Sequence, residues 1–332
     1  MNYIGSKYSL LDFIDKTVRE IVGNDLSAVV FCDLFAGTGI VGRHFKTQVR
    51  KVISNDLEYY SYVLNRNYIG NNRKIEENDY FTLLNNLDPI DTGFIYTQYC
   101  LGGGYGRQYF SDENGKLIDT VRMEIERWRT IGKISDDIYY FLLCSLIESA
   151  DKHANTASVY GAFLKHLKQT AKKRMVITPA CFQTTSTEHE VYMEDANMLI
   201  QRIEGDILYL DPPYNARQYG ANYHLLNTIA EYLPFEPKGK TGLREYTKSG
   251  YCSKTTVKEY FDALIRDARF RYIVLSYNNE GLMSMEDIAG IMKHYGRYRV
   301  FQREYHRFKA DKTENRNHLT NSTTEYLHIL EK

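Results

Sequence analysis

Apolar, strand-like runs alternate with helical patterns at both ends of the sequence. The run at residues 28–33 is followed by a glycine turn and a helix, and a second strand and helix come directly afterwards. Toward the carboxyl end the same order returns with the apolar runs 206–210 and 271–277. Strands and helices alternating at this spacing predict a doubly wound α/β fold with a mostly parallel sheet. Residues 298–305 and 324–330 also look strand-like, and we expect them to finish the sheet as an antiparallel pair.

The middle of the sequence has a different pattern. Helical periodicity dominates there, most clearly in residues 114–132 and 135–154, and no succession of strands and helices is seen. We therefore predict one α/β domain made of residues 1–75 and 191–332, interrupted by a mostly helical insert at residues 76–190. A chain of 332 residues is long enough to bury a substantial core in this arrangement.

The composition is that of a soluble globular protein, with 43% hydrophobic and 25% charged residues. No apolar run approaches the roughly 20 residues of a membrane span. Charged residues interrupt the amino-terminal stretch, so we expect no secretory signal. Five cysteines without CxxC spacing, and histidines without HExxH spacing, predict reduced thiols and no bound metal. These features favour a cytoplasmic protein.

Basic residues are concentrated locally, although the net charge is zero. Residues 165–174 contain five Lys or Arg and no acid, residues 238–254 contain five against one acid, and residues 297–312 contain six against two. Each run can be an ordinary solvated surface, but aromatic residues lie among the basic ones. A surface that follows nucleic-acid phosphates is therefore the alternative interpretation. In the second run the candidate contacts are Lys240, Arg244 and Lys248.

The sequence GTGIVG at residues 37–42 matches the GxGxxG pattern of dinucleotide-binding loops. A nicotinamide dinucleotide is one interpretation, and a purely structural turn is another. Asp33 lies at the end of the preceding strand, where its carboxylate would repel a pyrophosphate and suit a ligand with an ammonium group. Gly37 and Gly39 would let the backbone approach that ligand closely, and Asp56 can accept hydrogen bonds from ribose hydroxyls. We therefore favour S-adenosylmethionine as the cofactor.

The apolar run 206–210 ends in Asp-Pro-Pro-Tyr at residues 211–214. Proline cannot continue a sheet ladder, and two prolines in succession stiffen the chain into an extended corner. Such a corner can hold a nucleobase that carries an exocyclic amine. The Asp211 carboxylate and the Pro212 carbonyl can accept hydrogen bonds from the amine, and Tyr214 can stack on the base. These interactions strengthen as positive charge develops on the nitrogen, so they favour the transition state of methyl transfer.

Four motifs occur in a characteristic order: YIGSK (3–7), DLFAGTG (33–39), SNDL (54–57) and, after a long insert, DPPY (211–214). This order resembles that of the Dam-like, α-class adenine-specific DNA methyltransferases, the modification enzymes of type II restriction systems. The resemblance covers essentially the whole chain. It implies an S-adenosylmethionine-dependent enzyme that methylates the exocyclic amine of an adenine flipped out of duplex DNA. Dam enzymes carry WAGGK where this chain has YIGSK, so their sequence specificity does not transfer.

The resemblance also implies roles for single residues. Asp211, Pro212 and Tyr214 match the catalytic tetrapeptide, and Tyr3 and Lys7 match an element that touches the methionine end of the cofactor. Asp195 is similar to the residue that meets the adenine amine of the cofactor, although an acid at a helix start is often only a cap. The implied cofactor-binding residues are Tyr3, Lys7, Asp33, Phe35, Gly37, Gly39, Asp56, Asp195 and Asp211.

For DNA, the resemblance implies a target-recognition region in the insert at residues 76–190. Its segment 97–110 contains several glycines, aromatic residues and Arg107, as expected of a loop that enters a groove, with an ordinary surface loop as the alternative. We expect the basic segment 238–254, which is broken by glycines, to be a mobile loop that becomes ordered on DNA.

Three residues directly after the proline corner are further candidates for DNA contact. Asn215, Arg217 and Tyr219 are expected near the flipped nucleotide or the gap that it leaves. For Tyr219, packing inside the protein is an equal alternative.

Other substrates remain open at this point. The nearest alternative is the same chemistry on the cytosine amine, although such enzymes more often carry serine in place of Asp211. Methyltransferases of RNA or of protein glutamine typically carry asparagine there and lack so long an insert. A non-catalytic DNA-binding protein of the same fold would not need an intact tetrapeptide. As partners, the resemblance implies duplex DNA and a cognate restriction endonuclease that acts on the same site without direct contact.

Overall fold

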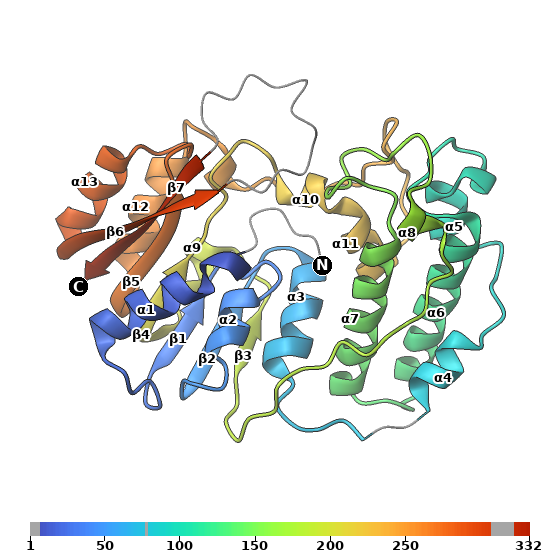
Figure 1. Cartoon of the computed structure of the whole chain (residues 1–332), viewed down its shortest axis with the longest axis horizontal. Helices are drawn as coiled ribbons and strands as arrows, with labels where there is room; N and C mark the ends of the chain where they lie inside the picture. The colour runs from blue at the N-terminus through green and yellow to red at the C-terminus, as the bar shows by residue number, and fades with distance from the viewer. Residues whose placement is uncertain (1–6, 77–78, 307–321) are drawn as a thin grey trace. The chain divides into compact units, whose positions relative to one another are not determined.

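The computed structural model describes residues 7–76, 79–306 and 322–332, which form two compact units (Figure 1). One, here called the sheet unit, comprises Lys7–Leu57, Thr187–Gln218 and Lys248–Lys332. The other, here called the helical unit, comprises Glu58–Ser186 and Tyr219–Thr247 among the described residues. Each unit has its own hydrophobic core.

The sheet unit contains a seven-stranded sheet in the order β3-β2-β1-β4-β5-β7-β6. The first five strands of the chain pair in parallel, and β7 pairs antiparallel with both β5 and β6. The predicted mostly parallel α/β sheet with an antiparallel end is therefore confirmed. The strands are β1 (Val30–Asp33), β2 (Lys51–Asn55), β3 (Glu190–Tyr192), β4 (Glu204–Leu210), β5 (Arg269–Asn278), β6 (Arg297–His306) and β7 (Ser322–Glu331).

Helices cover both faces of this sheet because successive strand residues point to opposite sides. On one face, Phe31 of β1 stacks on Phe45 of α2, with ring centroids 4.4 Å apart. On the other face, Leu208 of β4 shares a core cluster with residues of α9, α12 and α13, including Phe261 and Met292. The helices of this unit are α1 (Leu11–Val22), α2 (Ile40–Phe45), α9 (Ala196–Leu199), α12 (Val257–Asp267) and α13 (Met285–Tyr295).

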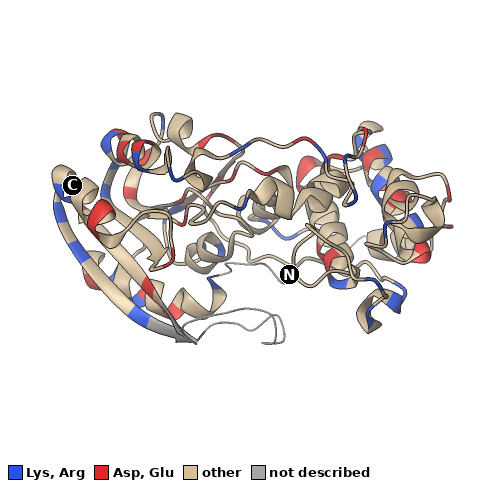
Figure 2. Ribbon diagram, turned by 90° about the horizontal axis from the view of Figure 1, so that it is seen from above, with Lys and Arg blue, Asp and Glu red and all other residues tan. Residues whose placement is uncertain are grey.

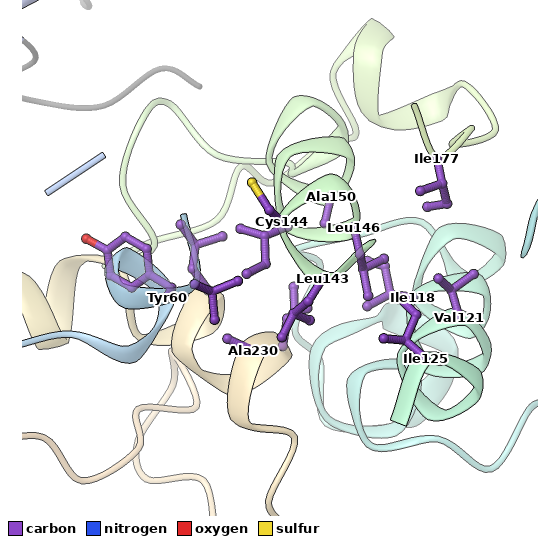
Figure 3. Close-up of a cluster of buried hydrophobic side chains, with 14 of the residues drawn as sticks. Tyr60, Ile118, Val121, Ile125, Leu143, Cys144, Leu146, Ala150, Ile177 and Ala230 are labelled. Carbon is purple, nitrogen blue, oxygen red and sulfur yellow. The ribbon is translucent and has the colours of Figure 1, made fainter. Parts of the chain in front are cut away.

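The helical unit is built around two long helices, α6 (Asp112–Thr130) and α7 (Asp136–His153). Each begins at a serine N-cap, Ser111 or Ser135, whose hydroxyl accepts a hydrogen bond from a backbone N–H of the first turn. Figure 3 shows their apolar side chains meeting in the buried cluster of this unit. The other α-helices are α3 (Tyr59–Asn65), α4 (Tyr80–Asn85), α5 (Phe94–Tyr99), α8 (Gln169–Lys172), α10 (Tyr219–Asn222) and α11 (His224–Glu231).

The borders of the compact units differ from the sequence-based borders at residues 75/76 and 190/191. Helix α3 belongs to the helical unit, and so does the segment Tyr219–Thr247, which follows the proline corner. The reason lies in α11, whose apolar residues Leu226 and Ile229 are buried in the cluster that α6 and α7 form. The assignment of target recognition to residues 76–190 remains a prediction.

No helix in the described part of the chain is long and apolar enough to cross a membrane.

Candidate active site

Three acids follow neighbouring strands at one edge of the sheet. Asp33 ends β1, Asp56 follows β2, and Asp211 follows β4. Because β1 pairs in parallel with both β2 and β4, the carboxyl ends of the three strands lie side by side. The strand order reverses at this point, and doubly wound sheets bind ligands there. The sheet unit thus brings together acids that are separated by up to 178 positions in the sequence.

The glycine loop is held by two of these acids. The Asp56 carboxylate accepts a hydrogen bond from the Gly37 N–H at 2.8 Å, and the Asp33 carboxylate accepts one from the Gly42 N–H at 2.9 Å. Gly37 and Gly39 have φ angles of 53° and 73°, in the left-handed region that side chains disfavour. The loop therefore needs glycine at these two positions and presents bare backbone at the carboxyl edge.

The left-handed conformation of Gly39 leads to a stability prediction. Gly39→Ala is expected to lower the free energy of unfolding by about 1–2 kcal/mol, because a Cβ is strained at this φ. Gly290→Ala is the matched control: Gly290 lies in α13, and a Cβ there would meet no atom within 4 Å. That control is expected to stabilise by about 0.5–1 kcal/mol. Urea denaturation of both variants measures the two effects, and equal changes would contradict the prediction.

Asp33 is fully enclosed, and burial raises the pKa of its carboxyl to about 7, with Asp211 and Asp56 adding to the rise. The hydrogen bond from Gly42 acts in the opposite direction but is outweighed. A buried carboxylate that is poorly compensated favours a cationic ligand. This fits the ammonium group that the sequence analysis assigned to the ligand.

Asp33→Asn is expected to flatten the pH dependence of stability. The pKa of Asp33 rises from 3.8 to about 7 on folding, so its stabilising contribution is complete below pH 3.8 and is lost as the pH rises to about 7. The loss is on the order of 4 kcal/mol. Asn can still accept from Gly42 and has no charge to bury, so the variant should be the more stable protein at pH 8. Urea unfolding from pH 4 to pH 8 tests this, and equal pH dependence in both proteins would contradict it.

An aromatic cluster lies beyond the glycine loop. The ring of Phe35 packs edge-on against Tyr251 at 5.0 Å between centroids, and the Tyr251 hydroxyl donates to the Asn197 side chain at 2.7 Å. Asp195 is the N-cap of α9: its carboxylate accepts from the backbone N–H groups of Asn197 and Met198 at 2.9 and 3.1 Å. Its predicted contact with the cofactor remains a prediction. Tyr251 and Asn197 were not predicted as site residues, because neither lies in a local motif.

The proline corner contains a buried ion pair. The Lys7 ammonium lies 2.9 Å from an Asp211 carboxylate oxygen, and the two side chains are only 6% and 18% exposed. The same ammonium lies 5.8 Å from the centroid of the Tyr214 ring. Tyr214 is fixed by an edge-on contact with Tyr277 at 6.4 Å, and its carbonyl accepts a hydrogen bond from the Leu282 N–H at 3.0 Å. The corner is thus a rigid element with a defined carboxylate and a defined ring.

The charges at the corner influence each other strongly. Burial raises the pKa of Asp211, and the neighbouring Lys7 partly offsets this. Burial alone would lower the pKa of Lys7, but the carboxylates of Asp211 and Glu325 raise it above its usual value. Lys7 therefore stays charged and favours the carboxylate form of Asp211. Glu325 lies on β7 opposite Asn278 at the end of β5, and the sequence analysis did not predict it.

The DNA-contact candidates are divided between the two units. Asn215, Arg217 and Lys248 lie in the sheet unit, where the Asn215 side chain accepts from the Arg217 N–H at 2.9 Å and closes a turn. Arg217 and Lys248 are exposed. In the helical unit, Tyr219 stacks on Tyr223 at 6.1 Å, which agrees with the packing alternative. The remaining three candidates also lie in the helical unit: Arg107, Lys240 and Arg244.

Tyr3 lies outside the described residues. Among the residues that the structure describes, no group of three or more His, Cys, Asp or Glu could hold a metal ion.

A mostly parallel sheet with a glycine loop, acids at its carboxyl edge and an Asp-Pro-Pro-Tyr corner defines an α/β methyltransferase. Residues 3–291 match the family model of the D12 class N6 adenine-specific DNA methyltransferases, and the chain belongs to this family. It is thus an adenine-specific DNA methyltransferase, as the sequence analysis predicted. Membership of this family identifies the amine of adenine in DNA as the group that is methylated. It therefore decides against the three alternatives: a cytosine amine, an RNA substrate and a non-catalytic DNA-binding protein.

Several named relatives agree with this assignment. The chain is 63% identical to the type II methyltransferase M.NlaIII of Neisseria lactamica, over 100% of this chain and 99% of that protein. It is 41% identical to the type II methyltransferase M.CviAII of Paramecium bursaria Chlorella virus 1, over 93% of each. It is also 41% identical to M.FokI of Planomicrobium okeanokoites, over 93% of this chain but only 50% of that longer protein.

Proposed function

We propose that this chain methylates the N6 amine of adenine at one short sequence in duplex DNA, with Asp211, Pro212 and Tyr214 as its catalytic residues. The observation that carries this assignment is the buried Lys7–Asp211 ion pair at the end of β4. It supplies a charged hydrogen-bond acceptor in a place from which water is largely excluded. Such an acceptor is what a weakly nucleophilic amine requires.

The adenine amine is a poor nucleophile because its lone pair is delocalised into the ring. The Asp211 carboxylate and the Pro212 carbonyl would accept hydrogen bonds from its two N–H groups and draw the nitrogen toward tetrahedral geometry. As positive charge develops on nitrogen, both interactions strengthen, so they lower the barrier more than they tighten substrate binding. The excess proton can leave through the hydrogen bond to Asp211, whose pKa is raised by burial.

Tyr214 would hold the base in the corner. A target adenine must leave the duplex to enter such a site, and an aromatic face offsets part of the lost stacking by roughly 1–3 kcal/mol. The edge-on contact with Tyr277 fixes the Tyr214 ring before the base arrives. The enzyme would therefore not need to order this ring at the moment of binding.

S-adenosylmethionine would supply the methyl group as an electrophilic sulfonium. Supporting residues for its binding are the buried Asp33 for the ammonium group, the bare backbone of Gly37 and Gly39, and Asp56 for the ribose. Phe35 and Asp195 lie on the side of the Tyr251 cluster, where we place the adenine of the cofactor. Lys7 contacts Asp211 directly, and we propose that it lies where the cofactor site meets the catalytic corner.

We also propose that the chain belongs to a restriction-modification system. Support comes from the names of its relatives, which are type II methyltransferases or modification methylases. A cognate endonuclease would cut the same sequence when it is unmethylated, without contacting this chain.

Mapping of methylated bases tests the proposed function. Plasmid DNA from a methylase-free host is incubated with S-adenosylmethionine and either the protein or its Asp211→Asn variant, and is then read by long-read sequencing. We expect N6-methyladenine at one short motif with the wild type and almost none with the variant. Methylated cytosine, or adenine marks without a motif, would contradict the proposal.

A further inference from the structure

Three loops of the helical unit are joined by buried side chains into one surface. The loops are residues 98–110, 155–168 and 238–243, and we call them together the loop platform. They are far apart in the sequence and belong to the same compact unit. The sequence analysis gave residues 97–110 and the basic runs 165–174 and 238–254 as separate candidates for nucleic-acid contact, and the structure shows how these loops are joined.

Arg107 ties the first loop to the third. Its side chain is 7% exposed, and its guanidinium donates to the carbonyls of Gln98, Gly239 and Lys240 at 3.1, 3.2 and 3.3 Å. The Tyr99 hydroxyl adds a hydrogen bond to the Gly242 carbonyl at 2.7 Å. The guanidinium of Arg107, which was expected to contact DNA, thus donates its hydrogen bonds to carbonyls of the protein. The geometry therefore gives Arg107 a role inside the protein.

The third loop is itself a tight hairpin. Backbone hydrogen bonds join Lys238 and Leu243 in both directions, at 2.9 and 2.8 Å. Gly242 has a φ of +70°, and a Cβ there would lie 2.8 Å from the Arg107 side chain. The glycines of residues 238–243 thus serve the turn and the close approach of Arg107. The expected mobility of the whole segment 238–254 remains a prediction.

Asn155 ties the second loop to the first. It is fully buried, its amide donates to the carbonyls of Gln108 and Leu164 at 3.0 and 2.9 Å, and its side-chain oxygen accepts from the Lys168 N–H at 3.0 Å. Within the second loop, the buried Tyr160 accepts a hydrogen bond on its carbonyl from the Tyr109 hydroxyl at 2.7 Å. Both ends and the middle of this loop are therefore fixed.

The exposed side chains of the platform suit nucleic acid. Leu101 and Tyr105 are 57% and 61% exposed, although the loop that carries them is held in place by the ties just described. Lys165 and Lys240 are exposed, and among the described residues neither ammonium group makes an ion pair or a hydrogen bond. The three loops contain five Lys or Arg and no Asp or Glu. Figure 2 shows where basic and acidic residues lie in the described part of the chain.

We propose that the loop platform is the surface of the helical unit that binds duplex DNA. Lys165 and Lys240 contact phosphates, Leu101 and Tyr105 contact bases, and Arg107 is a positioning residue that holds the surface together. This inference rests on the proposed function, since it assumes that DNA is the substrate. A protein partner would leave the absence of acids unexplained, whereas phosphates explain it directly.

Fixing these loops before binding has a physical benefit. Ordering a flexible loop on DNA costs conformational entropy for each residue that is immobilised. Loops that Arg107 and Asn155 already hold in place lose little conformational entropy on binding. The bases of the DNA then contact a surface whose shape is already defined. Discrimination between sequences should therefore depend on the ties as well as on the contacts.

Salt titration of DNA binding tests the phosphate contacts. Fluorescence anisotropy with a labelled random duplex at several salt concentrations needs neither methyl transfer nor a known motif. Lys165→Ala and Lys240→Ala should each reduce the slope of log K against log salt by about 0.9. The control is Lys74→Ala, an exposed lysine of the same unit outside the platform, which should leave the slope unchanged. Equal slopes in all three variants would overturn the proposal.

The positioning role of Arg107 has its own measurement. Arg107→Met should weaken DNA binding and speed hydrogen exchange at the Leu243 amide of the free protein, because the hairpin loses its tie. Weaker binding with unchanged hydrogen exchange at Leu243 would make Arg107 a direct DNA contact and overturn its role as a tie. If that variant does not fold, Tyr105→Ala provides the second test. The Tyr105→Ala variant should lose roughly tenfold in affinity for an unmethylated duplex that contains the motif found by the mapping experiment. Its affinity for a random duplex should change little. Equal losses of affinity for the two duplexes would overturn the base contact.

These outcomes are distinct from failure of the proposed function. Wild-type protein that methylates a motif while the platform variants bind like Lys74→Ala would refute the platform alone. Wild-type protein that makes no methylated adenine would refute the proposed function, whatever the titrations show.

Discussion

Asp211→Asn will slow methyl transfer by roughly 10²- to 10³-fold, the usual cost of removing one charge-stabilising group from an active site. The amide retains the shape of the carboxyl but has no negative charge to respond to the charge that develops on the adenine amine. It also leaves the Lys7 ammonium without its carboxylate partner. Single-turnover transfer of labelled methyl groups, with protein in excess over duplex DNA, measures the chemical step without product release.

A matched control lies on the same strand. Asp206 accepts a backbone hydrogen bond from the Val30 N–H at 2.7 Å, and it lies near the start of β4 rather than at its carboxyl end. Asp206→Asn should keep the rate within a few-fold of wild type. If both variants lose activity equally, or if Asp211→Asn acts only by weakening binding of the two substrates, the catalytic role of Asp211 is wrong.

Lys7→Met is expected to shift the acidic limb of the pH–rate profile to higher pH. Burial raises the pKa of Asp211, and Lys7 is the group that opposes this rise. Without Lys7 the pKa of Asp211 rises further, so less of the enzyme carries the carboxylate at neutral pH. Activity should fall at pH 7 and partly return as the pH is raised. A pH profile of single-turnover rates measures the shift.

Lys7→Met should also destabilise the fold by about 3 kcal/mol at alkaline pH, because it leaves the buried Asp211 carboxylate without its ion-pair partner. The folded-state pKa of Asp211 in the variant lies above its unfolded value, so the loss is smallest at low pH and grows as the pH rises through that pKa. The double variant Lys7→Met/Asp211→Asn should regain stability but not activity. An unshifted profile, or a loss of stability independent of pH, would show that the pair does not control the ionisation of Asp211.

Much of the sheet could be predicted because its signals are local. Apolar runs bounded by turns located β1, β4 and β5, and the carboxyl ends of parallel strands necessarily share an edge. From this alone, Asp33, Asp56 and Asp211 could be expected to lie together. The glycines at positions 37 and 39 were predictable for a similar reason, since a strand–turn–helix connection this tight requires left-handed backbone angles.

What could not be predicted depends on contacts between distant parts of the chain. The pairing of Lys7 with Asp211 joins residues 204 positions apart, and neither sequence context indicates it. Helix α11 follows the catalytic corner in sequence but packs with α6 and α7, because its apolar side chains complete that core. Arg107 was expected to contact DNA because it lies among glycines and aromatic residues, and its buried position depends on carbonyls from Gln98 and Gly239 that the sequence does not bring together.

Catalysis by the proline corner is tested most directly by a crystal structure of the protein with duplex DNA and a non-transferable analogue of S-adenosylmethionine. We expect an adenine outside the helix, stacked on Tyr214. Its N6 should lie about 2.6–3.2 Å from an Asp211 oxygen and from the Pro212 carbonyl. An adenine that remains in the duplex, or one whose N6 contacts neither group, would show that Asp211 and Pro212 do not have the proposed catalytic roles.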